Sequence, residues 1–158
     1  MRGNVNTRLM KLDQGEYDAI ILACAGLIRL GFEDRIKQPL DAQTSLPAVG
    51  QGALGKETRK GDESVRQLIK PLIDSKTMTE VLAERALNAT LEGSCSVAIA
   101  GYAKTMGEKL LLKGLVGKVE SGSILRAENT GSTSQPKVLG ELVANQLLDI
   151  GAGKLLEG

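Results

Sequence analysis

The sequence predicts two architectures in succession: an α/β region, and then an α+β unit built on a three-stranded antiparallel sheet. An apolar run with helical patterns on both sides lies near the N-terminus, and three strand-like runs lie between two helical patterns in the C-terminal half. A glycine-rich stretch separates them. The 158 residues suffice for one ordinary domain or two small ones. We expect three segments, 1–46, 47–74 and 75–158.

Residues 1–46 have the pattern of an incomplete α/β domain. Thr7 is a candidate cap for a short helix that Gly15 ends. Residues 17–23 are typical of a strand buried on both faces, and a second helix is expected over 25–30. A lone strand between two helices cannot bury both of its faces. We therefore expect this segment to be unstable alone or to need a partner, such as a second copy that shares strands.

Glycines mark the middle segment, residues 47–74. Gly50, Gly52 and Gly55 match G-x-G-x-x-G, which binds dinucleotides when it follows a strand and opens a helix. Here a polar run follows instead, and the next helical pattern starts near residue 62. Because glycine permits unusual backbone angles, we interpret the segment as a flexible crossover between domains.

The C-terminal segment, residues 75–158, has the pattern of a compact α+β unit. A capping box at Thr77-Met78-Thr79-Glu80 predicts a helix that runs to about Glu92, with an apolar face at Val81, Leu82, Ala86 and Ala89. Strands are expected at 97–103, 109–119 and 123–129, and a last helix from near Pro136. The order α-β-β-β-α predicts a sheet with its helices on one face. We expect this unit to fold independently.

Composition argues against several classes of function. The net charge of +1 gives no field for nucleic acid, and one Phe, two Tyr and no Trp offer no stacking platform. There is no His, and Cys24 and Cys95 lack metal-ligand spacing, so no metal site is expected. No apolar run could span a bilayer, and the N-terminus lacks a signal-type stretch. We expect a cytoplasmic protein without membrane partners.

Cys95 is the first candidate for chemistry. It follows a helix stop at Gly93 and precedes a strand, which favours a thiol presented on a loop. The alternative is a half-buried structural cysteine. Cys24, among apolar neighbours, is interpreted as a buried small hydrophobe.

Three arginines, Arg2, Arg8 and Arg29, are candidates for a polyanion cleft. Guanidinium groups bind carboxylates bidentately, although most arginines are solvated surface charges. Residue types alone leave two functions open. One is an enzyme that handles a polycarboxylate with the help of a loop cysteine, and the other is an interaction domain with an incidental cysteine.

Several stretches together resemble the porphobilinogen deaminase (hydroxymethylbilane synthase) family. They are Arg2-Gly3-Asn4-Val5-Asn6-Thr7-Arg8-Leu9, Tyr17 to Ala23, Ala25 to Gly31, Leu46-Pro47-Ala48-Val49-Gly50-Gln51-Gly52-Ala53, and Glu84-Arg85-Ala86 through Leu91-Glu92-Gly93-Ser94-Cys95. The order is that of the family's C-terminal half. The resemblance implies that 1–46 is the second half of a periplasmic-binding-protein-like α/β domain two, 47–74 the return segment of domain one, and 75–158 the cofactor-attachment domain.

The resemblance also implies a function in tetrapyrrole and heme biosynthesis. The family joins porphobilinogen units head to tail into hydroxymethylbilane and releases ammonia. Its dipyrromethane cofactor, attached by thioether, would belong on Cys95, while Arg2, Arg8, Arg29 and Gln51 match positions that line the cleft for the growing polypyrrole chain.

The family's catalytic aspartate matches no position of this chain. We therefore expect a fragment that lacks most of domain one and is inactive alone, and that is completed by the N-terminal half of the enzyme. Family members are usually monomers, although this chain could self-associate. The alternative is a truncated, non-catalytic interaction domain.

Overall fold

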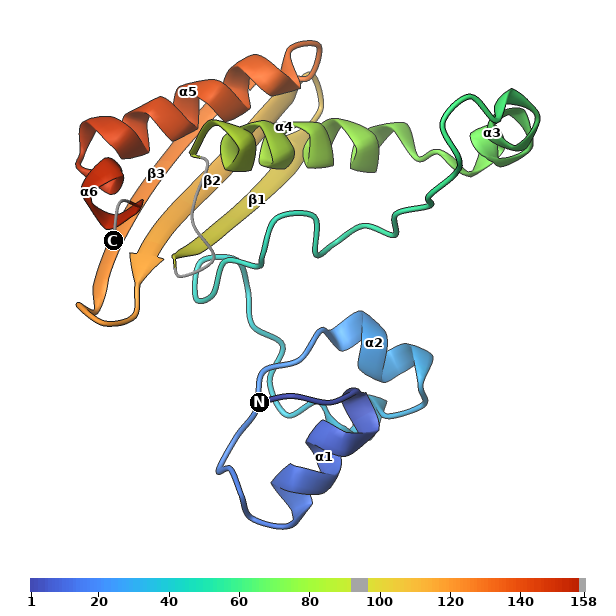
Figure 1. Cartoon of the computed structure of the whole chain (residues 1–158), viewed down its shortest axis with the longest axis vertical. Helices are drawn as coiled ribbons and strands as arrows, with labels where there is room; N and C mark the ends of the chain where they lie inside the picture. Colours follow the sequence, from blue (N-terminus) through green and yellow to red (C-terminus); the bar gives the residue numbers. More distant parts are fainter. Residues whose placement is uncertain (92–96, 157–158) are drawn as a thin grey trace. The chain divides into compact units, whose positions relative to one another are not determined.

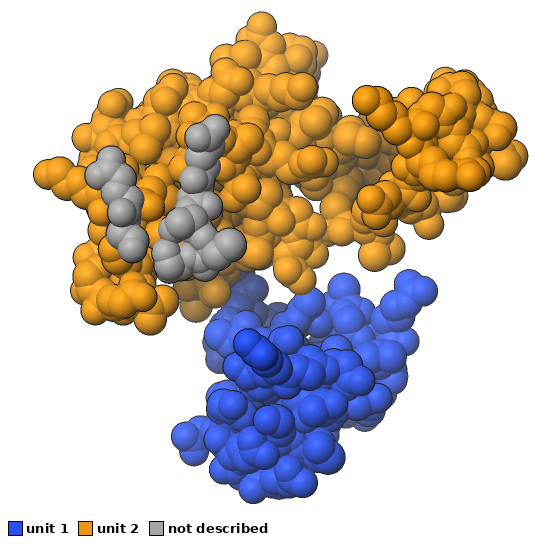
Figure 2. All heavy atoms as spheres, in the orientation of Figure 1, with its two compact units in different colours: residues 1–41 blue, residues 42–158 orange. Residues whose placement is uncertain are grey.

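The computed structural model describes residues 1–91 and 97–156. It divides the chain into two compact units, residues 1–41 and residues 42–158, which Figure 2 shows in blue and orange.

Residues 1–41 contain two short helices, α1 (Val5–Asp13) and α2 (Cys24–Arg29), and a 3-10 turn, η1 (Glu33–Arg35). The prediction that Thr7 caps the first helix was wrong. Asn4 is the cap, because its side-chain oxygen accepts from the Thr7 amide at 2.9 Å. The Thr7 hydroxyl donates to the same oxygen at 3.0 Å and therefore supports the cap from inside the helix.

The strand predicted over residues 17–23 is absent from residues 1–41, all of which the structure describes. A strand leaves its amide and carbonyl groups unpaired unless a neighbouring strand takes them, and this unit holds none. Ile21, expected to be buried, is 76% exposed. The buried apolar side chains of the unit are Leu9 of α1 and Leu27 of α2.

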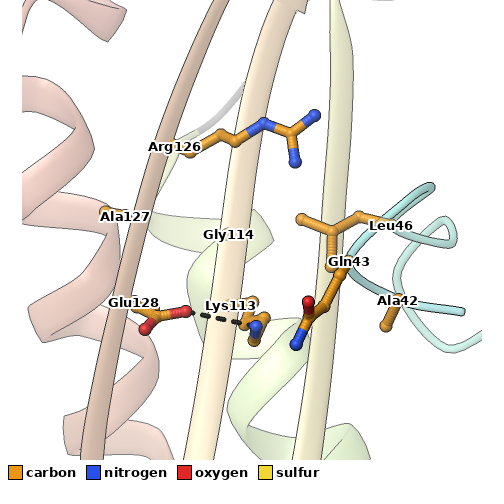
Figure 3. Close-up of a pocket in the computed structure, with 8 residues that line it drawn as sticks. All are labelled: Ala42, Gln43, Leu46, Lys113, Gly114, Arg126, Ala127 and Glu128. Atoms are coloured by element: carbon orange, nitrogen blue, oxygen red, sulfur yellow. Dashed lines mark ion pairs between the residues drawn. The ribbon is translucent and has the colours of Figure 1, made fainter.

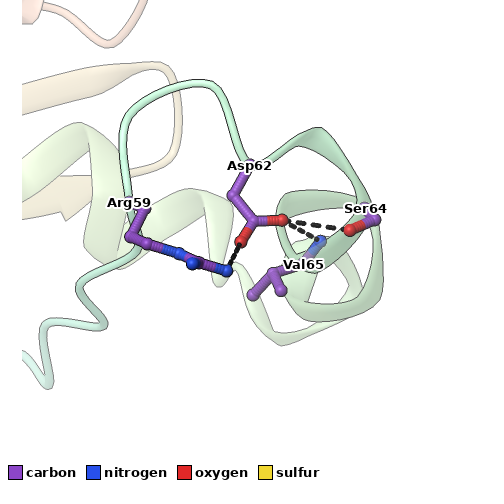
Figure 4. A network of polar contacts seen from close by, with 4 residues as sticks. All are labelled: Arg59, Asp62, Ser64 and Val65. Atoms are coloured by element: carbon purple, nitrogen blue, oxygen red, sulfur yellow. Dashed lines mark hydrogen bonds and ion pairs between the residues drawn. The ribbon is translucent and has the colours of Figure 1, made fainter.

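The second unit begins with an irregular crossover that leads to α3 (Glu63–Ile69) and a 3-10 turn, η2 (Lys70–Leu72). Asp62 caps α3, as Figure 4 shows: it accepts from Arg59 at 2.8 Å, from Ser64 at 3.0 Å and from the Val65 amide at 3.3 Å. These bonds, that from Arg59 first, hold the pKa of Asp62 below its usual range.

The C-terminal part of this unit confirms the predicted α-β-β-β-α order (Figure 1). Its elements are α4 (Ser75–Leu91), β1 (Ala98–Met106), β2 (Lys109–Lys118), β3 (Ser123–Ser132), α5 (Pro136–Asp149) and a short α6 (Ala152–Leu156). The antiparallel sheet has the order β1-β2-β3, and α4 and α5 cover one of its faces.

Alternation along β2 places the core between this face and the helices. Leu110, Leu112 and Val116 are fully buried, whereas the residues between Leu110 and Val116 on the opposite face are partly exposed. Leu87 of α4 and Leu147 of α5, also fully buried, belong to the same core cluster. One continuous core therefore joins both helices to the sheet.

Gly140 brings α4 and α5 into backbone contact. A Cβ atom there would lie 2.4 Å from the Ala83 carbonyl oxygen and 2.8 Å from the Leu87 amide nitrogen. The contact makes Ala83, Leu87 and Leu91 the buried apolar stripe of α4. The predicted face was wrong, since Val81, Leu82 and Ala86 are only half-buried and Ala89 is exposed. The helix has apolar residues on more than one side, and packing determines which of them are buried.

The start of α4 also differs from its prediction. Asp74, rather than Thr77, supplies the cap, since its carboxylate accepts from the Thr77 amide at 2.7 Å. This bond is the main reason that the pKa of Asp74 lies below its usual range.

Candidate functional site

The start of α1 presents two of the predicted arginines. Gly3 has a φ of 118°, and a Cβ atom there would lie 2.8 Å from Thr7 Cγ2, so the turn requires glycine. Arg8 Nε donates to the Gly3 carbonyl at 2.8 Å. This bond ties the half-buried Arg8 side chain back over the cap, while Arg2 is exposed just before it.

Arg29 is the last residue of α2 and is exposed. Within the described residues, Arg2, Arg8 and Arg29 form no ion pair. Arg35 of the same unit behaves differently, because it is bound by Asp13. Among the described residues, no ion pair joins the three predicted arginines into one site.

Gln51 lies at the end of a tight turn in the second unit. The Gln51 amide donates to the Ala48 carbonyl at 3.0 Å, and Gly50, with a φ of 73°, takes the left-handed conformation that the turn needs. The Gln51 side chain is exposed. No strand precedes this turn, and the next helix starts only at Glu63, so the glycine pattern has the geometry of a crossover and not of a dinucleotide site.

Of the two cysteines, only Cys24 lies within the described residues. Cys95 lies outside the described residues, in the segment that connects α4 to β1. Cys24 is a free thiol at the start of α2. It is half-buried rather than fully buried, since α2 contributes only Leu27 to the interior.

Glu84, which was not predicted to be a site residue, has two backbone partners from distant parts of the chain. Its carboxylate accepts from the Gly50 amide at 2.8 Å and from the Ala103 amide at 2.9 Å, and the residue is only 7% exposed. Burial raises the pKa of Glu84, against the lowering effect of the two amide bonds. Because packing selects the stripe of α4 that contains Glu84, the sequence alone carried no signal for this residue.

A hollow of about 420 Å³ lies over the sheet face opposite the helices (Figure 3). Gln43 and Leu46, which precede the crossover, line one side, and Lys113, Arg126 and Glu128 line the other. Lys113 Nζ lies 3.3 Å from Glu128 Oε2, so its charge is largely compensated. Of the predicted residues that the structure describes, Arg2, Arg8, Arg29 and Gln51, none lines this hollow.

In the ranges 1–91 and 97–156 no group of three or more metal-binding side chains comes together. None of the helices in these ranges is long and apolar enough to cross a membrane.

Comparisons with known proteins agree on one family. Residues 1–67 match the model for the porphobilinogen deaminase dipyrromethane cofactor-binding domain, and residues 78–149 match the model for the porphobilinogen deaminase C-terminal domain. The chain is 57% identical over 157 residues to the porphobilinogen deaminase of Ruthia magnifica subsp. Calyptogena magnifica, and 54% identical over 157 residues to that of Vesicomyosocius okutanii subsp. Calyptogena okutanii (strain HA).

Each of these alignments covers 99% of this chain and 52% of the relative, so the chain spans about half the length of the curated relatives that it matches. The first matched region extends beyond residue 41 into the second unit, and the second matched region lies within that unit. The chain belongs to the porphobilinogen deaminase family, of which it spans the last part of the cofactor-binding region and the C-terminal domain.

Proposed function

We propose that this chain supplies the cofactor attachment point and part of the substrate cleft of a hydroxymethylbilane synthase. That enzyme joins porphobilinogen units head to tail and releases ammonia at each addition. The observation that carries the proposal is the pair of matched regions: residues 1–67 contain Arg2, Arg8, Arg29 and Gln51, and residues 78–149 contain Cys95.

The arginines suit a substrate that is rich in carboxylates. Each pyrrole carries two carboxylates, so a growing chain accumulates charge that fixed guanidinium groups can bind bidentately. The absence of ion pairs at Arg2, Arg8 and Arg29 among the described residues supports this role. Arg8 keeps its terminal nitrogens for such a ligand, because it is Nε that donates to Gly3.

Cys95 is the residue proposed to anchor the dipyrromethane cofactor through a thioether. A thiolate is a good nucleophile toward the electrophilic carbon left when a porphobilinogen unit loses ammonia. When bound, the cofactor would supply the primer from which the polypyrrole is extended. Cys95 would hold this primer, while Arg2, Arg8 and Arg29 would bind carboxylates and Gln51 would line the cleft.

Turnover is proposed to require a group that the chain does not provide. Condensation of pyrroles develops positive charge on the ring nitrogens, which a carboxylate must stabilise. The family uses an aspartate for this step, and Asp13, Asp18 and Asp34 match no such motif. The 158-residue chain is therefore expected to show no sustained turnover alone.

Intact mass spectrometry with peptide mapping tests the attachment site. The chain is produced together with the N-terminal half of the Ruthia magnifica relative, and an adduct of two-pyrrole mass is expected on Cys95. Cys95→Ser should abolish the adduct and Cys24→Ser should leave it. An adduct on Cys24, or no adduct in an active mixture, would contradict the assignment.

Incubation with porphobilinogen tests the requirement for the missing group. Hydroxymethylbilane is expected from the mixture of both halves and not from the 158-residue chain. Sustained product formation by the chain alone would show that it contains a sufficient catalytic carboxylate.

A further inference from the structure

β1 is an edge strand, since it pairs with β2 on one side only. Alternate residues of such a strand direct their amides away from the sheet, where they need other acceptors. The amides of Gly101, Ala103 and Thr105 do so, and each has an acceptor from outside the sheet. Gly101 donates to the Pro47 carbonyl at 3.1 Å, Ala103 to Glu84 at 2.9 Å and Thr105 to Glu80 at 2.8 Å.

Glu84 differs from Glu80 in what its second oxygen does. Glu84 Oε1 accepts from Ala103 of β1, and Oε2 accepts from Gly50 of the crossover. One carboxylate thus joins three separate pieces of chain: α4, β1 and the crossover. Among the described residues Glu80 accepts only from Thr105, so it caps the edge without holding the crossover.

Packing supports the same attachment. A Cβ atom at Gly101 would lie 3.2 Å from Val49 Cγ2 and 2.9 Å from Leu87 Cδ2. The Val49 side chain therefore sits against the bare backbone of β1. Together with the Pro47 carbonyl and the Gly50 amide, it docks residues 47–50 along the edge of the sheet.

We propose that Glu84 is a positioning residue that latches residues 47–50 of the crossover onto β1 and so fixes where Gln51 lies relative to the C-terminal domain. Gln51 follows Gly50 directly and ends the same turn, so its backbone moves with the latched amide. The importance of Gln51 rests on the proposed function, whereas the latch does not. Loss of the Glu84 carboxylate should release the crossover while the core remains folded.

Residue-resolved amide exchange by NMR on the 158-residue chain tests the latch. Glu84→Gln keeps the shape but offers one acceptor oxygen and an NH2 group that cannot accept. The single oxygen cannot serve both backbone amides, so exchange at Gly50 or at Ala103 should rise by about tenfold or more. Exchange at Gln51, which follows Gly50 in the same turn, should rise as well. Leu112, in the central strand, should keep its protection.

Glu80→Gln is the matched control, one helical turn away on α4. It should raise exchange at Thr105 and leave Gly50 and Gln51 unchanged. Should Glu84→Gln leave Gly50, Gln51 and Ala103 protected, or should it deprotect Leu112 equally, the latch would be refuted.

A second variant keeps the proposal testable if Glu84→Gln does not fold. Val49→Ala removes the packing against Gly101 but leaves the carboxylate in place. Exchange should rise at Gly101 and stay low at Gly50 and Ala103, whose amides the carboxylate still holds. Release of Gly50 in Val49→Ala would overturn the proposal, because packing and not the carboxylate would then hold residues 47–50. The mass of Cys95 reads the proposed function separately, so the two ideas can fail independently.

Discussion

Residues 1–41 and the α+β part of residues 42–158 satisfy their backbone groups in different ways. The first unit relies on local caps, such as that of Asn4, and its predicted strand over residues 17–23 is absent. The second has a hydrogen-bonded sheet, and glutamate side chains of α4 accept hydrogen bonds from the outward-facing amides of its edge strand β1. A helix can form from nearby residues, whereas a strand needs a partner that its own segment does not contain.

The largest expected difference between the units is in the cost of removing core volume. Leu87→Ala should lower the free energy of unfolding by about 2–5 kcal/mol, because Leu87 is fully buried between α4 and the sheet. Leu27→Ala should cost clearly less, since Leu27 belongs to a unit with little other buried apolar surface. Urea denaturation of both variants measures this, and equal losses would break the contrast.

Glycine-to-alanine changes should have opposite signs in the two units. Gly140→Ala should destabilise by about 1–3 kcal/mol, because the new methyl group meets the backbone of α4. Gly26→Ala should stabilise α2 by about 0.5–1 kcal/mol, since a Cβ atom there meets nothing within 4 Å. Unfolding transitions of both variants provide the check. A neutral Gly140→Ala would show that α4 and α5 do not touch as described.

Removal of the Asn4 cap should lower the stability of α1 moderately. Asn4→Ala removes the acceptor for the Thr7 amide and should cost about 1 kcal/mol of helix stability. Faster exchange of the Thr7 amide and lower helicity by circular dichroism are the expected observations. Asn6→Ala, at an exposed position in the same helix, is the control and should change little.

The smallest expected effect is a difference in pH dependence between Asp74 and Glu84. The folded pKa of Asp74 is lowered, so its contribution is present above the unfolded value of about 3.9 and is lost as pH falls through the folded pKa. The folded pKa of Glu84 is raised, so its contribution is full below the unfolded value of about 4.3 and is lost as pH rises through the folded pKa.

Urea titrations at a series of pH values can separate these two carboxyl groups. Asp74→Asn should reduce the loss of stability in acid, and Glu84→Gln should remove a loss on the neutral side. Identical pH profiles for Glu84→Gln and the parent chain would show that Glu84 does not titrate differently in the folded state.

The sequence was most informative in the C-terminal part of the chain, where each strand finds its partner within the same segment. Strand-like runs joined by short hairpin-like links predicted all three strands of the sheet, and β1 and β3 extend further than expected, to Met106 and Ser132. The buried stripe of α4 could not be predicted, because apolar residues lie on more than one side of this helix and the contact at Gly140 selects among them.

The candidate site also contains a part that local sequence can predict and a part that depends on contacts between distant residues. The start of α1 brings Arg2 and Arg8 to one helix end through local bonds, as adjacent residues in a sequence can suggest. Glu84 could not be assigned its partners from the sequence. Gly50 lies 34 positions before it and Ala103 lies 19 after it, and only the folded sheet edge brings them together.

Glu80 and Glu84 of α4 accept hydrogen bonds from edge-strand amides that a neighbouring strand would otherwise bind. Glu80 and Glu84 are one helical turn apart, a rise of about 6 Å. The amides of Thr105 and Ala103 that they bind are two strand residues apart, about 6.8 Å. The two repeats nearly coincide, so two successive contacts fit, but the mismatch grows with each further turn. A carbonyl from another segment, that of Pro47, serves the next amide at Gly101. A designer of small α+β domains could therefore shield a sheet edge with paired glutamates over two rungs, and would need a third piece of chain for the rung beyond.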